Sequence, residues 1–236
     1  MKYTSYRFYP ILVLLVLCWT TPTTAQTSHN YGFVSPNTRD DLTIDQAIKG
    51  MASADEKKMI GRAANLGCVV RTRIRAFRAL GSWSDGAEYS VMLRMKSDED
   101  SLRYVLARMG REAKQKSVLY FHPQANGTAL IYRLEPRSKN LKWLANTLDR
   151  IGIEFRTLVP ANNSTWIYLV DLKNELRDKV RVAARRLRAR VSVEKGTASF
   201  VGADQAEQAK DVFTQAIDDY EAKHPNLPAT CDVQRR

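Results

Sequence analysis

The sequence has few of the residues that most catalytic and metal sites require. Its 236 residues include three cysteines and three histidines, with no CxxC pair and no Cys/His cluster, which argues against a zinc site. It has no glycine-rich phosphate loop, and GSWSDG at 81–86 lacks the glycine that a nucleophile elbow carries two positions before its serine. We therefore expect no cofactor and no bound metal, and we assign no catalytic residue.

Long apolar runs are absent after the N-terminus. Residues 1–25 contain Lys2 and Arg7, then an apolar run from Ile11 to Trp19, then small residues ending in Ala25, which is the pattern of a secretory signal peptide. The run of about nine residues is shorter than the ~20 that span a bilayer. We expect cleavage after Ala25 and a secreted or periplasmic protein without stable membrane insertion. A membrane anchor or a lipid-modified N-terminus is the alternative.

Removal of this segment leaves two cysteines, Cys68 and Cys231. An even pair in an exported chain predicts a disulfide bond, which here would join the C-terminal tail to the start of the folded region. A loop of this length would stabilise the fold by roughly 4–5 kcal/mol in the chain-entropy model. Two unrelated thiols are the alternative.

The chain is strongly basic, with a formal net charge of +12. Such a charge attracts anionic polymers and acidic partners, although it also serves simply to keep a protein soluble. Eight of the twenty residues from Arg177 to Gly196 are Arg or Lys.

As a helix, this segment has one apolar stripe (Leu176, Val180, Ala183, Ala184, Leu187) that would pack on a sheet, and Asp178 points away from the arginines. The arginines form a row beside the stripe: Arg177, Arg181, Arg185 and Arg188. The row is either the solvated face of an ordinary helix or a contact for a polyanion or an acidic partner.

The N-terminal part of the mature chain has its own organisation. Residues 26–41 have no periodicity and are expected to form an extended leader. Residues 42–86 are expected to form a helical arm and a linking strand, because Thr43 with Gln46 and Ser53 with Glu56 are capping boxes. Residues 66–80 fit either a helix or a strand, with β-branched residues favouring the strand.

The rest of the chain alternates regularly between strands and helices. Helices are expected at 97–115, 138–151, 177–188 and 204–224, and strands at 88–95, 117–123, 128–135, 155–160, 165–172, 190–196 and 197–203. Hairpin turns are expected at QANG, at ANNS and at Lys195-Gly196. The order predicts an α+β fold of two tandem split-βαβ (ferredoxin-like) units, 87–160 and 165–224, each an antiparallel sheet with helices on one face. Residues 225–236 are a tail.

These features favour an exported, non-enzymatic binding or assembly protein of the cell envelope or extracellular space that engages a protein partner. A polyanion-binding protein, for nucleic acid or acidic polysaccharide, that uses the basic helix is one alternative. A hydrolase with an unrecognised site is another. The strand aromatics Trp166 and Tyr168 share a face, but no strand matches an RNA-recognition module. In a eukaryotic secretory route, Asn126 and Asn163 are glycosylation acceptors.

Overall fold

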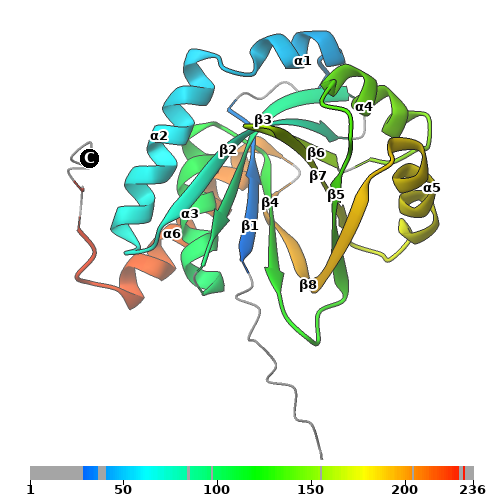
Figure 1. The fold of residues 1–236 in the computed structure, drawn as a ribbon. Helices are drawn as coiled ribbons and strands as arrows, with labels where there is room; N and C mark the ends of the chain where they lie inside the picture. The colour runs from blue at the N-terminus through cyan, green and yellow to red at the C-terminus, as the bar shows by residue number, and fades with distance from the viewer. Residues whose placement is uncertain are drawn as a thin grey trace, which may run out of the picture.

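The strands of the chain lie in one closed antiparallel barrel with helices around it (Figure 1). This computed structural model describes residues 29–36, 41–83, 86–96, 98–154, 156–203, 205–228 and 231. The expected signal peptide, and residues 26–28 and 37–40 of the expected leader, lie outside these residues. Among the helices that the structure describes, none combines the length and hydropathy needed to cross a membrane.

The strand order around the barrel is β1-β3-β2-β6-β7-β5-β8-β4. The strands are β1 (Asn30–Val34), β2 (Ile74–Trp83), β3 (Gly86–Met95), β4 (Ser117–Pro123), β5 (Ala129–Glu135), β6 (Arg156–Ala161), β7 (Ser164–Asp171) and β8 (Arg190–Gly202). The helices are α1 (Ile44–Gly50), α2 (Ala54–Val69), α3 (Glu99–Glu112), α4 (Leu141–Asp149), α5 (Arg177–Leu187) and α6 (Ala206–Lys223).

The predicted fold class, two tandem ferredoxin-like units with helices packed on one face of each sheet, is wrong. The reason is β8, which continues as one strand of 13 residues through Lys195-Gly196, where a hairpin was expected. Its first half pairs with β5 and its second half with β4. Consequently β4 and β5, expected to form a hairpin across QANG, lie on opposite sides of β8 instead.

Gly196 is the residue at which β8 passes from one partner strand to the other. It pairs with Pro123 of β4 and with Ala129 of β5. A Cβ atom at this position would lie 2.3 Å from the His122 carbonyl oxygen and 2.6 Å from the Phe121 ring. Glycine is therefore required here for close approach of the strands.

The barrel closes on its other side through a short seam. The strands β2 and β6 pair only at Leu80↔Leu158 and Gly81↔Thr157, whereas β2 and β3 pair along ten positions. The segment expected to be a leader also contributes to closure, because β1 inserts between β3 and β4.

Local sequence signals explain the helices and turns. The capping box of Thr43 with Gln46 is confirmed, and the Ser53 side chain accepts a hydrogen bond from the Glu56 amide. The segment 66–80, for which the sequence left helix and strand open, contains the end of a helix followed by the start of a strand. The helix α2 ends at Val69 and β2 begins at Ile74. The four helices expected after residue 96 are present, and the ANNS turn joins β6 to β7.

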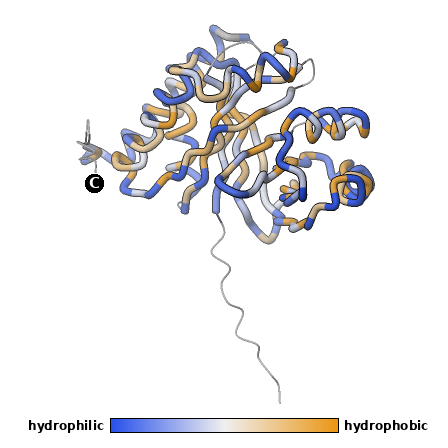
Figure 2. Tube along the Cα trace, turned by 45° about the horizontal axis from the view of Figure 1, so that its top comes forward, coloured by the Kyte–Doolittle hydropathy of each residue, from blue (hydrophilic) through white to orange (hydrophobic). Residues whose placement is uncertain are grey.

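The hydrophobic core has three parts because each strand alternates its side chains between the barrel interior and the helices. One part lies beneath α2, α3 and α6, and a second lies beneath α1, α4 and α5. The third lies inside the barrel and includes Tyr31, Met92, Phe121, Ile131, Tyr168 and Val170. Figure 2 shows hydrophobic residues along the barrel strands, while the helices alternate between hydrophilic and hydrophobic residues.

The structure joins the sulfur atoms of Cys68 and Cys231 and places their Cα atoms 6.0 Å apart, within the range for a disulfide. Cys68 lies near the end of α2, and Cys231 packs against the core beneath α2, α3 and α6. The bond would tie the C-terminal tail to this helix.

For the mature chain beginning at Gln26, we expect no free thiol under denaturing, non-reducing conditions. Replacement Cys231→Ser should lower the free energy of unfolding by about 2–5 kcal/mol, because the closed loop no longer restricts the unfolded chain. Thiol counting with a chromogenic reagent and urea denaturation measure both. Two reactive thiols in the unreduced protein would contradict the pairing.

Replacement Gly196→Ala should destabilise the barrel by about 1–3 kcal/mol, the usual range for overpacking, because the methyl group meets backbone of β4. The matched control is Gly61→Ala, at an exposed position of α2 where a Cβ has nothing within 4 Å. That change should raise stability by about 0.5–1 kcal/mol through helix propensity. Equal effects of the two replacements on the urea midpoint would refute the close approach at Gly196.

Candidate functional site

The predicted arginine row lies on α5, and three of its four members border one groove. Arg177, Arg181 and Arg185 line a groove of about 620 Å³ between α5 and the strands β5 and β8. The fourth, Arg188, is exposed at the C-terminal cap of the helix, in the left-handed conformation with φ 46°, and does not line the groove. We call this the α5–β8 groove.

The floor of the α5–β8 groove is apolar. It is formed by residues from α5, β5 and β8: Leu130, Tyr132, Val180, Ala184, Val191 and Val193. The expected apolar stripe of α5 is present, since Val180, Ala183 and Leu187 are buried. The groove therefore presents apolar surface and positive charge side by side.

The groove exists because α5 leaves part of β8 uncovered. Val191 and Val193 face outward from the barrel and are 42% and 51% exposed, two of the few large hydrophobic side chains at the surface. On the second half of the same strand, Val201 is 3% exposed because it packs in the core beneath α6. Among the helices that the structure describes, α6 thus covers one half of β8 and none covers the other half.

The arginines of the groove are weakly neutralised. Asp178, expected to point away from the row, instead lies 3.5 Å from Arg181, and that expectation was wrong. Both side chains of this pair are highly exposed, so water and salt screen the attraction. Within the described residues, neither Arg177 nor Arg185 forms an ion pair. Burial raises the pKa of Tyr132 in the floor.

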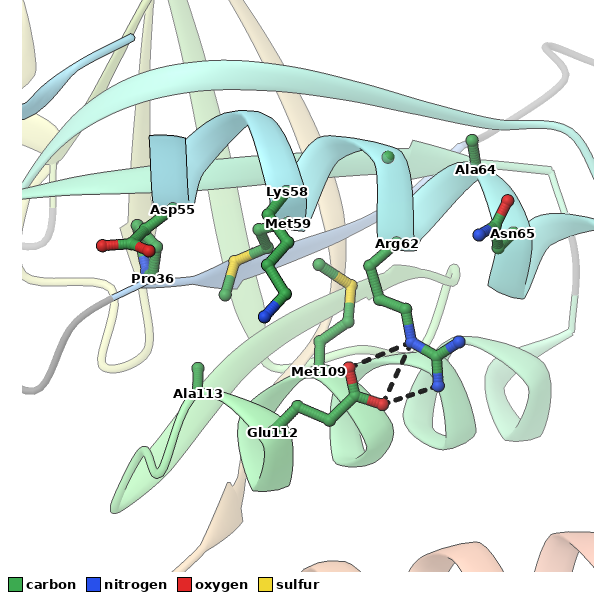
Figure 3. A pocket seen from close by; sticks show the side chains of 11 residues that line it. Pro36, Asp55, Lys58, Met59, Arg62, Ala64, Asn65, Met109, Glu112 and Ala113 are labelled. Carbon is green, nitrogen blue, oxygen red and sulfur yellow. Dashed lines mark hydrogen bonds and ion pairs between the residues drawn. The ribbon is translucent and has the colours of Figure 1, made fainter. Parts of the chain in front are cut away.

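A larger groove, of about 850 Å³, lies between α2 and α3 (Figure 3). Met59 and Met109 line it, and its charged groups include both signs. Figure 3 shows Arg62 reaching across to Glu112. The N–O distance of this ion pair is 2.6 Å. Because these opposite charges pair with each other, the α2–α3 groove has no evident charge preference for a ligand.

Sequence analysis singled out Trp166 and Tyr168 but missed the charged residues that share the barrel interior with them. Arg94 pairs across strands with Tyr31, Arg133 with Tyr168, and Glu194 with Ile131, so these side chains share the inner face. We call Tyr31, Arg94, Arg133, Trp166, Tyr168 and Glu194 the inward cluster. The alternation of each strand is visible in the sequence, but in an open sheet the polar face would meet solvent. Closure of the sheet turns that face inward.

Four further polar residues line neither groove and do not belong to the inward cluster. The Tyr120 hydroxyl donates to Glu99 over 2.7 Å, and burial raises its pKa. His122 Nδ1 lies 2.7 Å from Asn30 Oδ1. Asn126 and Asn163 are exposed in turns. In the described part of the chain, no group of three or more His, Cys, Asp or Glu residues is placed to hold a metal ion.

The double replacement Arg181→Gln/Arg185→Gln should change the free energy of unfolding by less than about 0.5 kcal/mol. Both positions are exposed, the ion pair to Asp178 is screened, and Gln keeps helix propensity. Thermal and urea unfolding measure this. A larger loss would mean that the arginines hold the fold together, and the groove would then need no ligand to explain them.

Comparison with known proteins places the chain in no family. No family model and no curated protein matches it. One solved structure that resembles it, from Lactobacillus acidophilus NCFM, is described as a "putative monooxygenase". The two chains are 11% identical, the alignment covers 73% of this chain and 94% of that one, and the TM-score is 0.25. At this TM-score the resemblance supports no conclusion about fold or activity.

Proposed function

We propose that this chain is an exported, non-enzymatic binding protein of the cell envelope or extracellular space. Its α5–β8 groove holds an acidic amphipathic helix of a protein partner. The observation that carries this proposal is the row Arg177, Arg181 and Arg185 beside an uncovered apolar floor. The export rests on the sequence of residues 1–25.

Charge and hydrophobicity together define the class of partner. A simple polyanion would use the arginines and leave Val191 and Val193 in water, where exposed apolar area has no benefit. A purely apolar partner would bury the arginines without an opposite charge, which is costly. A helix with leucine-like residues on one side and carboxylates on the flank satisfies both parts of the groove.

The other half of the barrel supports a helix rather than an extended segment as the occupant. There, α6 covers the second half of β8 and buries Ala209, Phe213 and Ile217 at helical spacing. The first half of β8 presents outward valines in the same way, but no helix in the described part of the chain covers them. A partner helix would complete the same packing arrangement, helix against outer barrel face, on this side.

A defined probe tests the proposal. It is a fluorescent peptide as long as α6, with leucines at i, i+3, i+4 and i+7 and glutamates elsewhere, and its affinity is measured by fluorescence anisotropy. Two variants each remove one property: Arg181→Gln/Arg185→Gln removes charge, and Val191→Thr/Val193→Thr removes apolar surface at constant shape. Each should weaken peptide binding by about tenfold, equivalent to roughly 1.4 kcal/mol.

The control Arg137→Gln/Arg150→Gln removes the same charge from exposed positions outside the groove and should leave the peptide affinity unchanged. Heparin distinguishes the polyanion alternative. The charge variant should lower the slope of log affinity for heparin against log salt by up to about two, and the valine variant should not affect it.

Three outcomes would overturn the proposal. If the valine variant binds the peptide as tightly as the unmodified protein, the groove acts through charge alone. The alternative hypothesis of a polyanion-binding protein is then favoured. If the control variant weakens binding equally, the attraction is a property of net charge. If sedimentation shows a dimer that the valine variant dissociates, a second copy of the chain occupies the groove.

A further inference from the structure

We propose that the inward cluster is a binding site for a small organic anion that carries a hydrogen-bond donor, such as a hydroxylated carboxylate. This site lies inside the barrel, is separate from the α5–β8 groove, and does not depend on the function proposed above. The inference rests on where the strands place these side chains and on which of their atoms lack partners.

The barrel gathers the inward cluster at one end. Tyr31 and Trp166 lie near the starts of β1 and β7, Arg94 and Arg133 near the ends of β3 and β5, and Glu194 in the first half of β8. The antiparallel registers bring these strand ends together. Five strands therefore contribute to one site, and no short sequence motif contains it.

Three polar atoms of the inward cluster are buried without a hydrogen-bond partner among the described residues. They are Nε of Arg94, Nε of Arg133 and Oε2 of Glu194. A buried donor or acceptor left unpaired costs about 1–3 kcal/mol, and more when the group is charged. Two N–H donors and one carboxylate acceptor would be satisfied together by a ligand that has an anionic acceptor and a donor of its own.

The remaining contacts of the cluster hold it in place. The Arg133 guanidinium carbon lies 3.7 Å from the centre of the Trp166 ring, and Arg94 Nη2 lies 3.2 Å from His29 Nδ1. The Tyr31 hydroxyl donates to Glu194, and the Tyr31 and Tyr168 rings lie 5.7 Å apart. The arginines are thus oriented before a ligand arrives, which lowers the entropy cost of binding.

The charge balance also favours an anion. The cluster has two arginines and one glutamate, and burial raises the pKa of both Tyr31 and Tyr168, so the tyrosines stay neutral. Burial raises the pKa of Glu194 as well, while Arg94, Arg133 and the hydrogen bond from Tyr31 act in the opposite direction. One bound monoanion would neutralise the excess arginine. Apolar neighbours such as Phe121 and Ile131 suit a ligand with an apolar body.

The probes are 4-hydroxybenzoate, which has the carboxylate, the apolar ring and the donor, and benzoate, which lacks only the donor. Affinities are measured by isothermal titration calorimetry on the mature protein. Arg94→Gln and Arg133→Gln should each weaken 4-hydroxybenzoate binding by at least about tenfold. Glu194→Met should abolish the preference for 4-hydroxybenzoate over benzoate, because it removes the carboxylate that accepts the hydrogen bond from the ligand hydroxyl.

Two controls keep the result interpretable if a variant folds poorly. In the unmodified protein, 4-hydroxybenzoate should shift the indole N–H resonance of Trp166, assigned with a Trp166→Phe variant. The groove variant Arg181→Gln/Arg185→Gln should bind the probe with unchanged affinity. The proposal is overturned if neither probe moves the Trp166 resonance, or if natively folded Arg94→Gln and Arg133→Gln bind as tightly as the unmodified protein. A loss of binding in the groove variant would place the probe outside the barrel and overturn it too.

Discussion

The barrel depends on the passage of one strand, β8, through Gly196. Its two halves hydrogen-bond to strands that a hairpin would otherwise have joined, so β8 connects the two sides of the molecule. Without a side chain at Gly196, the backbone can lie against His122 and Phe121 of β4. Because β8 continues through Gly196 instead of turning back, the sheet can close into a barrel that has an inner face.

The alternation of side chains along the same strand separates the two proposed binding surfaces. Val191 and Val193 belong to the outer groove, whereas Glu194 belongs to the inward cluster. The two surfaces also use arginine differently. On α5 the guanidinium groups are exposed and attract negatively charged groups at a distance. Arg133, in contrast, is stacked on Trp166, and this packing orients it. The net charge of the chain is therefore relevant to the exposed arginines of α5 but says nothing about the role of Arg133.

Local features were predictable from the sequence because they depend on neighbouring residues. The cap at Thr43, the apolar stripe of α5 and the arginine row beside it all follow from helical spacing, and the structure contains them. The fold class was not predictable in this way. The pair Lys195-Gly196 is typical of a turn. A glycine that is needed because two strands approach closely gives the same pattern, so the sequence does not distinguish the two cases.

The candidate sites show the same division. Three of the four predicted arginines line the groove, but its floor is built partly from β5 and β8, which only the tertiary structure brings beside α5. Trp166 and Tyr168 were recognised as sharing a face, but the charged residues of the inward cluster were missed. Alternation along a strand shows which residues share a face, but it does not show which face becomes the barrel interior. Arg94 and Arg133 have the sequence pattern of solvent-facing residues, but closure of the sheet places them on the inner face of the barrel.

The short seam between β2 and β6 has a consequence for the order of folding. The hairpins β2–β3 and β6–β7 close small loops, so their formation costs little chain entropy. The seam joins Leu80 to Leu158 and Gly81 to Thr157, residues far apart in the chain, through only two paired positions. Contacts of this kind form late, because closing a long loop loses chain entropy that only a few hydrogen bonds offset. We expect the barrel to assemble as two preformed curved sheets that β8 already connects, with the β2–β6 seam the last to close and the first to part.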